Sequence, residues 1–514
     1  MPHSSRSNAN HRAYRDLGAI LTERAACAGD RVYVVEADAP ERRLTFAELD
    51  ALTCRLGHVL ADRGVKPGDR VSILSGNRWE LVVLFFGVQR HGAAVNPINV
   101  EVNGKNAARM LHDVEPRLAI LDAAVPATLR DAARAARFPT MDLDEVFAAL
   151  PGYPATSVDG GAASPRDIAI IDYTSGTTAT PKGVCISHEA FFYMGRSMVE
   201  RLGLGATDRV LEYRALSWAS PQCLSLAPTL QAGAGLVLAP AFSRRRFFPW
   251  IRRHDVTIAA GVPTVLAMLL ERPVPVTRRD VPSLKCVTSS AAPLSLDQQA
   301  AFERRYGVPI LQGCGMTEAG FMALNPPGAP RPGSIGPAVP YLHARFVDET
   351  GRVCPPGRLG ELVIGGPQMA SAYLTDRGTL VPLPADGFRT GDLGHADPDG
   401  YLYLTGRRKD LIIRGGVNIA PMEITTVLLA HPAVAEAVTL GVPDLVYGEA
   451  IASFVTLRPG QEASPSGLLA HCRTRLSDFK CPGRVLVLDA IPTTGRGKLD
   501  RERLCALWDG SAGP

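Results

Sequence analysis

Short apolar runs alternate along this chain with longer segments whose apolar residues recur at helical spacing. "RVSIL" (70–74), "LAILD" (118–122) and "IAIIDY" (168–173) each predict a strand, because they are short and almost wholly apolar. "WELVVLFFGVQRHG" (79–92) is longer and ends in glycine, which predicts a helix. The alternation continues over most of the chain and predicts an α/β architecture.

A second helix is predicted from about His188, because apolar side chains then recur on one face and Gly203 provides a stop. Between "IAIIDY" and this helix lies "TSGTTATPKG" (174–183), which is rich in hydroxyls and glycine and contains one lysine. The pattern therefore predicts a strand, a polar loop and a helix in direct succession.

The pattern changes near Arg407. "YLYLTG" (401–406) reads as a strand that ends in glycine, and "DLIIRGG" (410–416) begins another. The elements predicted after it form a small α+β unit, with a helix at 422–430, strands at 434–440 and 450–457, and a helix at 466–476. We predict a domain boundary at 408–410, which divides the chain into an N-terminal domain of residues 1–407 and a C-terminal domain of residues 408–514.

Composition narrows the class of protein. A chain of 514 residues is too long for one compact core, and its net charge of +4, from 55 basic and 51 acidic residues, predicts no nucleic-acid partner. The ten cysteines form no CxxC pair, which argues against a zinc site or a disulfide framework and favours a reducing cytoplasm. Glycines and prolines interrupt the most apolar span (224–242), so we expect a buried element there and no membrane helix.

The loop "TSGTTATPKG" suits a phosphate-bearing ligand. Backbone N–H groups and hydroxyls donate hydrogen bonds to phosphate oxygens, and Lys182 adds a positive charge. It is not a Walker A loop, because no glycine precedes the lysine and no hydroxyl follows it. A polar surface turn is the alternative interpretation of these residues alone.

The wider segment "YTSGTTATPKGVCISH" closely resembles the phosphate loop of the adenylate-forming superfamily, which includes acyl-CoA synthetases. Further matching motifs follow in the family's order: "GCGMTEAG" (313–320), "GFRTGDLG" (387–394), "GRRKDLIIRGGVNIAPMEI" (406–424) and "PTTGRGKLDRERL" (492–504). The resemblance covers roughly residues 44–504. It implies a large N-terminal domain of α/β layers with a β-barrel-like subdomain, and a small, mobile α+β C-terminal domain.

The resemblance also implies a reaction and its site. Members couple a carboxylate to the α-phosphate of ATP and then pass the acyl group to a thiol, with ATP, Mg²⁺ and CoA as cofactors. Glu318 would hold Mg²⁺, and Thr317, Glu318 and Lys498 would be catalytic. The residues implied for ATP or AMP binding are Thr174, Ser175, Gly176, Thr177, Thr178, Lys182, Ala291, Gln312, Gly313, Cys314, Thr317, Asp392, Arg407 and Lys498.

By the same resemblance the C-terminal domain rotates between the two half-reactions. Lys409 matches the hinge, and Gly415 and Gly416 match the tunnel for the pantetheine arm of CoA. Lys498 would bridge the carboxylate and the α-phosphate during adenylation. Taken alone, a lysine in a loop such as "GRGK" is usually a solvated residue.

Three positions depart from the family pattern. Ala179 and Ser290 stand where glycine is usual, and Cys314 replaces an aromatic residue that stacks on adenine. We expect Cys314 to weaken ATP binding or to move the stacking elsewhere, without removing the activity.

Trp218, Ser220 and Gln222 are the predicted acyl pocket, which favours a short or compact acid with polar groups; a core position is the alternative for Trp218. The expected function is an acid–CoA ligase that acts as a monomer or homodimer. One alternative is an enzyme that loads a separate acyl carrier protein, and another is a non-catalytic nucleotide-binding relative.

Overall fold

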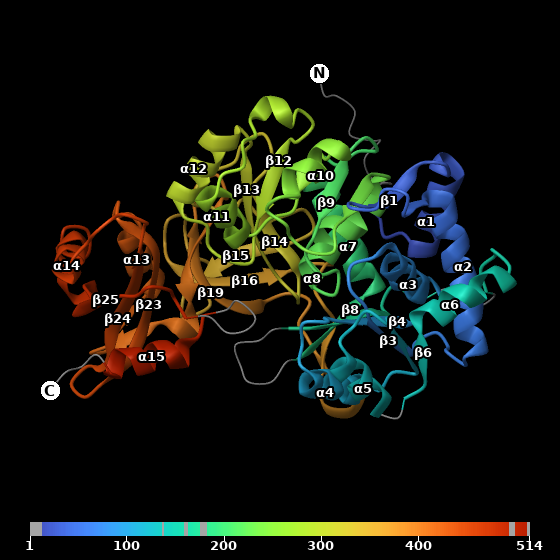
Figure 1. Cartoon of the computed structure of the whole chain (residues 1–514). Coiled ribbons are helices and arrows are strands. Elements are labelled where there is room, and N and C mark those ends of the chain that lie inside the picture. Colours follow the sequence, from blue (N-terminus) through green and yellow to red (C-terminus); the bar gives the residue numbers. More distant parts are fainter. Residues whose placement is uncertain (1–12, 136–137, 159–162, 175–181, 493–498, 511–514) are drawn as a thin grey trace, which may run out of the picture. The chain divides into compact units, whose positions relative to one another are not determined.

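The computed structural model describes residues 13–135, 138–158, 163–174, 182–492 and 499–510 (Figure 1). The chain divides into two compact units, which are described separately. Within the described residues, the first unit comprises 13–294, 298–344 and 364–388, and the second comprises 295–297, 345–363 and 389–510. The predicted boundary at 408–410 falls inside the second unit and stays a prediction.

The first unit contains an eight-stranded sheet in which most neighbouring strands are parallel. In spatial order its strands are β14 (Gly320–Leu324), β13 (Ile310–Met316), β12 (Cys286–Ser289), β11 (Ile258–Ala259), β9 (Arg209–Glu212), β10 (Gly235–Leu238), β1 (Val32–Glu36) and β2 (Arg43–Thr45). Because β9, β12 and β13 run in one direction, their carboxyl ends meet at one edge of the sheet, where ligands bind in open α/β folds.

A second eight-stranded sheet combines parallel strands with an antiparallel edge. In spatial order its strands are β18 (Leu380–Pro382), β17 (Ala372–Leu374), β8 (Gly183–Ser187), β7 (Ile168–Tyr173), β4 (Ala94–Ile98), β3 (Arg70–Leu74), β5 (Leu118–Leu121) and β6 (Thr140–Asp142). The predicted strands at 70–74 and 168–173 are confirmed residue for residue, and that at 118–122 to within one residue.

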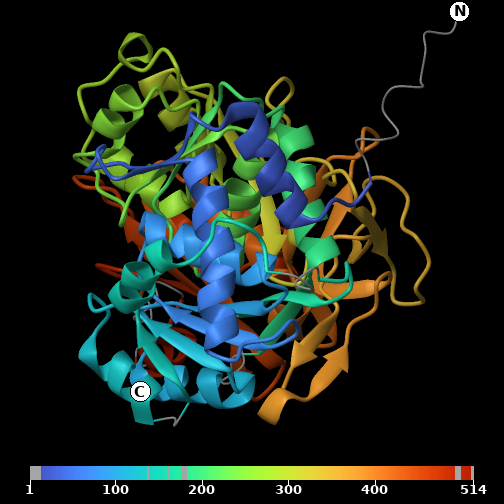
Figure 2. The same cartoon turned by 90° about the vertical axis from the view of Figure 1, so that its right-hand side faces the viewer.

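The helices before residue 307 are α1 (Leu17–Ala28), α2 (Phe46–Asp62), α3 (Trp79–Arg90), α4 (Gly104–Val114), α5 (Ala127–Ala135), α6 (Leu143–Ala149), α7 (His188–Leu202), α8 (Ala219–Pro221), α9 (Ala227–Ala232), α10 (Phe247–Arg253), α11 (Pro263–Glu271) and α12 (Leu296–Tyr306). The blue helices α1 and α2 face the viewer in Figure 2. Every residue of α3 from Glu80 to Gln89 is buried, as expected of a helix that is apolar all round.

The predicted sequence of strand, loop and helix around 168–203 is wrong in one respect. A strand, β8, lies between the loop and α7 and pairs antiparallel with β7. Its five residues are all buried, so the run "GVCIS" satisfies its backbone in the sheet before Ser187 caps the helix. The predicted helix itself is confirmed, and it ends at Gly203 with φ 62°.

The second unit is built on two sheets. Most residues of the first, four-stranded sheet belong to this unit; its strands in order are β15 (His343–Val347), β16 (Gly360–Gly365), β19 (Phe388–Ala396) and β20 (Leu402–Arg407). The other sheet comprises β22 (Val417–Ile419), β21 (Ile412–Arg414), β24 (Gly448–Leu457) and β23 (Val434–Asp444), with β25 (Arg484–Val487) paired to β24. Its helices are α13 (Pro421–Leu429), α14 (Pro465–Arg473) and α15 (Arg501–Gly510), so the predicted α+β pattern is confirmed.

Among the helices that the structure describes, none combines the length and the apolar character needed to cross a bilayer. Each of the ten cysteines lies within the described residues and is a free thiol.

Candidate functional site

The predicted phosphate loop joins β7 to β8, and its two ends are tied together. The backbone N–H of Thr174 donates to the carbonyl of Lys182 at 3.0 Å, one residue beyond the last strand pair. Lys182 is exposed. The predicted ligands Ser175, Gly176, Thr177 and Thr178, and the variant position Ala179, lie outside the described residues.

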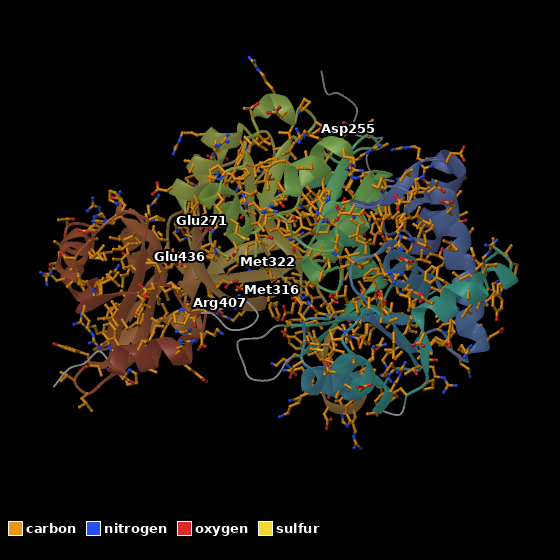
Figure 3. All side chains as sticks on the ribbon, viewed as in Figure 1. Asp255, Glu271, Met316, Met322, Arg407 and Glu436 are labelled. Carbon is orange, nitrogen blue, oxygen red and sulfur yellow. The ribbon has the colours of Figure 1, made fainter. Side chains whose placement is uncertain are left out.

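Thr317 and Glu318 lie in the turn between β13 and β14, whose strands carry the labelled Met316 and Met322 in Figure 3. The turn is held by the backbone N–H of Ala319, which donates to the carbonyl of Met316 at 3.2 Å. Glu318 is only 8% exposed. Its Oε1 accepts a hydrogen bond of 2.7 Å from the hydroxyl of Tyr373, a residue of β17.

The carboxylate of Glu318 fits the predicted magnesium ion. Hard divalent cations prefer carboxylate oxygens, and among the described residues the Glu318 carboxylate is bound by the neutral hydroxyl of Tyr373 and forms no ion pair. Its charge therefore has no protein counter-ion in this part of the chain, which suits a cation bound together with phosphate.

Several residues implied for AMP binding lie at the carboxyl ends of β12 and β13. Ala291 has φ 72°, a left-handed conformation that costs a non-glycine residue roughly 1 kcal/mol. Nε2 of Gln312 donates to the carbonyl of Ala292 at 3.3 Å, which places Gln312 beside this loop. Gly313 and the half-buried Cys314 follow in β13. The structure thus brings Ala291 and Gln312 together.

Trp218, predicted for the acyl pocket, precedes the short helix α8. It is 47% exposed, which excludes the alternative of a core residue. Ser220 accepts a hydrogen bond of 2.9 Å from Nη1 of Arg214, and the same guanidinium pairs with Glu212 at 2.6 Å. Since Arg214 occupies the acceptor side of Ser220, the Ser220 hydroxyl proton is available to an acceptor oxygen.

Gln222 begins a π-helix (Gln222–Leu226), a rare element that often marks functional sites. Its Nε2 donates to Oδ1 of Asp172 at 3.1 Å and to the carbonyl of Leu216 at 3.0 Å. Oε1 of Gln222 and Oδ2 of Asp172 are buried without a partner among the described residues. Burial raises the pKa of Asp172 to about 7, while the bond from Gln222 opposes the shift.

Within the second unit, Asp392 and Arg407 face each other across β19 and β20. Nε of Arg407 donates to Oδ1 of Asp392 at 2.9 Å, and the two residues are paired in the strand register. Burial raises the pKa of Asp392, and Arg407 and Thr390 oppose the shift. The geometry holds a buried carboxylate ready to accept hydrogen bonds, as the predicted contact with ribose hydroxyls requires.

The predicted hinge, Lys409, lies in a 3₁₀ helix (Arg408–Asp410). Burial lowers the pKa of Lys409, and the neighbouring charge of Asp410 opposes the shift. Asp410 is itself paired with Arg501. The predicted catalytic residue Lys498 lies outside the described residues.

Gly415 and Gly416 form the two-residue turn between β21 and β22, since Arg414 pairs with Val417. Their φ angles are 58° and 80°, as in the turns preferred by tight hairpins. This turn by itself accounts for glycine at both positions, so their predicted role in a CoA tunnel remains a prediction.

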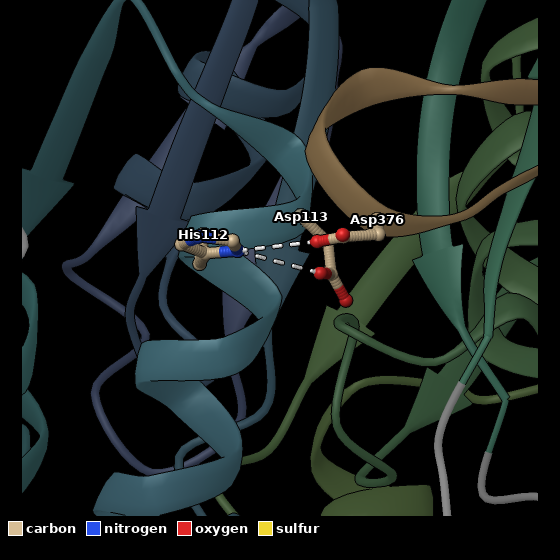
Figure 4. A group of neighbouring side chains, drawn as sticks. All are labelled: His112, Asp113 and Asp376. Carbon is tan, nitrogen blue, oxygen red and sulfur yellow. Dashed lines mark ion pairs between the residues drawn. The ribbon is translucent and has the colours of Figure 1, made fainter.

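A separate group of charged residues joins α4 to the 3₁₀ helix Asp376–Gly378 (Figure 4). Nδ1 of His112 lies 3.7 Å from one oxygen each of Asp113 and Asp376. Asp113 also lies 3.8 Å from Nε of Arg109. Because His112 and Asp376 are exposed and Arg109 competes for Asp113, we interpret the group as surface ion pairs that have no part in the predicted site.

Sequence reasoning missed Tyr373, Asp172 and Arg214. The sequence could have drawn attention to Asp172 and Arg214. Each is a charged residue within or close behind an apolar strand, and a charge in such a place needs a partner or a function. Tyr373 carried no such signal, since its partners Glu318 and Lys182 are distant in sequence.

Comparison with known proteins shows the family of this chain. Residues 21–374 match the model of the AMP-binding enzyme family, and residues 423–498 match the AMP-binding enzyme C-terminal domain. The sulfoacetate–CoA ligase of Cupriavidus necator is 34% identical over 95% of this chain and 97% of its own. A fatty acid–[acyl-carrier-protein] ligase, ScoC of Streptomyces coeruleorubidus, is 32% identical over 92% of this chain and 93% of its own.

A similar solved structure is ATP-bound MatB from Rhodopseudomonas palustris, with a TM-score of 0.86 and 27% identity over 96% of this chain and 99% of MatB. The likeness extends across both compact units and nearly the full length of each protein. By these matches, and by the two family models that cover most of its length, the chain belongs to the AMP-binding enzymes.

Proposed function

We propose that this protein is an AMP-forming carboxylic acid–CoA ligase that acts on a short acid with a second polar or anionic group. The observation that carries the proposal is the match to a sulfoacetate–CoA ligase over 95% of the chain, which includes both family domains. The ten free cysteines fit a reducing compartment, where such chemistry uses a free thiol.

The reaction has two steps. A carboxylate oxygen of the acid attacks the α-phosphorus of ATP, and pyrophosphate leaves; the thiolate of CoA then attacks the acyl carbon, and AMP leaves. Little covalent chemistry falls to the protein in the first step, so catalysis rests on positioning and on charge neutralisation.

The geometry within each unit supports the proposed roles of Glu318, Asp392 and Arg407, whereas those of Lys498 and Lys409 rest on the family resemblance. Lys182 neutralises the departing pyrophosphate, and Glu318 holds Mg²⁺, which would offset the charge of the phosphates. Asp392 accepts hydrogen bonds from the ribose hydroxyls while Arg407 fixes its orientation. Lys498 bridges the carboxylate and the α-phosphate, and a C-terminal domain of residues 408–514 turns about Lys409 between the steps.

The polar residues near α8 support the choice of acid. Ser220 has a hydroxyl proton to donate, because Arg214 supplies its other hydrogen bond. A long aliphatic chain would leave that proton without an acceptor, at a cost of about 1–3 kcal/mol.

A pyrophosphate-release assay with ATP, Mg²⁺ and CoA tests the proposal, with mass spectrometry of the products. The acids are sulfoacetate, oxalate, acetate and octanoate. We expect acyl-CoA from a short acid with two polar groups and little from octanoate.

The variant Lys498→Ala tests the role of Lys498. It should abolish adenylation and have a smaller effect on thioester formation from a supplied acyl-adenylate. Equal loss of both steps would contradict that role.

The second candidate is transfer to a separate acyl carrier protein, favoured by the similarity to ScoC. A parallel reaction with a purified carrier protein in place of CoA separates the two. Acyl-adenylate without acyl-CoA, together with loading of the carrier, would replace the CoA ligase proposal.

A further inference from the structure

The segment 368–374 connects the two parts of the first unit that carry Glu318 and Lys182. On one side, Nε2 of Gln368 donates to the carbonyl of Ala319 at 2.6 Å and to that of Phe321 at 2.8 Å. The backbone N–H of Ala370 donates to the carbonyl of Glu318 at 2.7 Å. Three hydrogen bonds therefore fix the turn between β13 and β14 to this segment.

On its other side the same segment is bound to the strand that follows the phosphate loop. The backbone N–H of Ser371 donates to the carbonyl of Cys185 at 2.9 Å, and β17 pairs antiparallel with β8. Tyr373 stands opposite Val184 in that register. The position of the Tyr373 side chain is thus determined by both neighbours.

The side chain of Tyr373 contacts both functional groups. Its hydroxyl donates to Oε1 of Glu318 at 2.7 Å. Nζ of Lys182 lies 5.2 Å from the centroid of its ring, within the range of a cation–π interaction. One side chain therefore restrains an acid and a base that are 136 residues apart in sequence.

The phenol is the donor in its contact with Glu318, and the pairing of β17 with β8 fixes where the ring lies. Because the hydroxyl donates to Oε1, the carboxylate keeps one orientation, and ligands oriented in this way bind metals more tightly.

We propose that Tyr373 is a positioning residue for the nucleotide with its magnesium ion: its hydroxyl orients Glu318 toward the ion, and its ring holds Lys182 toward the phosphates. The inference rests on the proposed function, because it takes Glu318 and Lys182 as the groups that contact Mg²⁺ and phosphate.

Calorimetric titration of ATP into the full-length protein at several Mg²⁺ concentrations tests this without any acid substrate. In Tyr373→Phe, which keeps the ring, we expect the Mg²⁺ requirement for ATP binding to rise ten- to hundred-fold, while affinity at saturating Mg²⁺ stays within two-fold of the wild type. In Tyr373→Leu, affinity at saturating Mg²⁺ should fall a further two- to five-fold, because the ring beneath Lys182 is lost.

Tyr341→Phe is the matched control. The hydroxyl of Tyr341 donates to Oε1 of Glu200 at 2.6 Å in the same unit, so this change removes a bond of the same kind away from the site. It should leave both the Mg²⁺ requirement and the affinity for ATP unchanged.

A purely structural role for Tyr373 would lower ATP affinity equally at every Mg²⁺ concentration, and that result would overturn the inference. So would an unchanged Mg²⁺ requirement in Tyr373→Phe. If the wild type binds no ATP at any Mg²⁺ concentration, the proposed function fails and the inference with it, whereas a failure confined to the Tyr373 variants leaves the proposed function standing.

Discussion

The buried acid Asp172 makes the stability of the protein depend on pH in a predictable direction. It is 1% exposed, and burial raises its pKa from 3.8 to about 7. Between these two values the folded protein keeps a proton that the unfolded chain has released, so stability falls as pH rises and levels off above about pH 7. A pKa difference of about three corresponds to a loss of about 4 kcal/mol across the whole window.

Replacement by asparagine removes this titration and keeps an oxygen for the bond from Gln222. From pH 5 to pH 8 the free energy of unfolding of the wild type should fall by about 3 kcal/mol relative to Asp172→Asn. Urea unfolding at both pH values measures the difference, in which the titration of all other groups cancels. Asp131→Asn, at an exposed position of α5, is the control and should track the wild type.

Equal pH dependence in the wild type and in Asp172→Asn would refute the reasoning. It would mean that Asp172 carries its charge in the folded protein throughout this range, paired with a group outside the described residues. The opposite sign, with the wild type gaining stability toward pH 8, would place the folded pKa below 3.8 and contradict burial as the dominant cause.

Three further predictions concern other parts of the site. Arg407→Gln should raise the pKa of Asp392 further, so calorimetry should show that ATP binding weakens more at pH 5.5 than at pH 8; an equal loss at both would contradict this. Ser220→Ala should raise KM for a dianionic acid about ten-fold and leave KM for acetate nearly unchanged in the pyrophosphate assay, because only the former uses the hydroxyl polarised by Arg214. Gly416→Ala should cost about 1 kcal/mol in urea unfolding through its φ of 80°, and an alanine that costs nothing would show that the turn adapts.

The sequence predicted the elements whose pattern is local. The strand at 168–173 and the helix from His188 to Gly203 are periodic in their own residues, so they could be read directly. β8 was missed because five buried residues without alternation do not distinguish a strand from the start of a helix. The segment is a strand because it forms hydrogen bonds with β7, and a reading of residues 183–187 alone does not include β7.

The residues of the candidate site also fall into two groups, those found from sequence motifs and those found only from the structure. Glu318, Asp392 and Lys182 stand in motifs that resemble those of the family, so the resemblance pointed to them. Tyr373 acts through contacts between strands that are far apart in the chain, and only the register of β17 against β8 brings it to Lys182. Residues that orient others in this way depend on tertiary structure, which the linear pattern does not record.

The hairpin of β7 and β8 separates the support of the phosphate loop from its chemistry. The strand pairing and the bond from Thr174 to Lys182 join backbone groups of residues 168–174 and 182–187. A loop at the start of a helix would lack this independence, because its residues also cap the helix. The support of the loop's two ends therefore comes from the sheet, and it uses none of the side chains that the resemblance assigns to the phosphates.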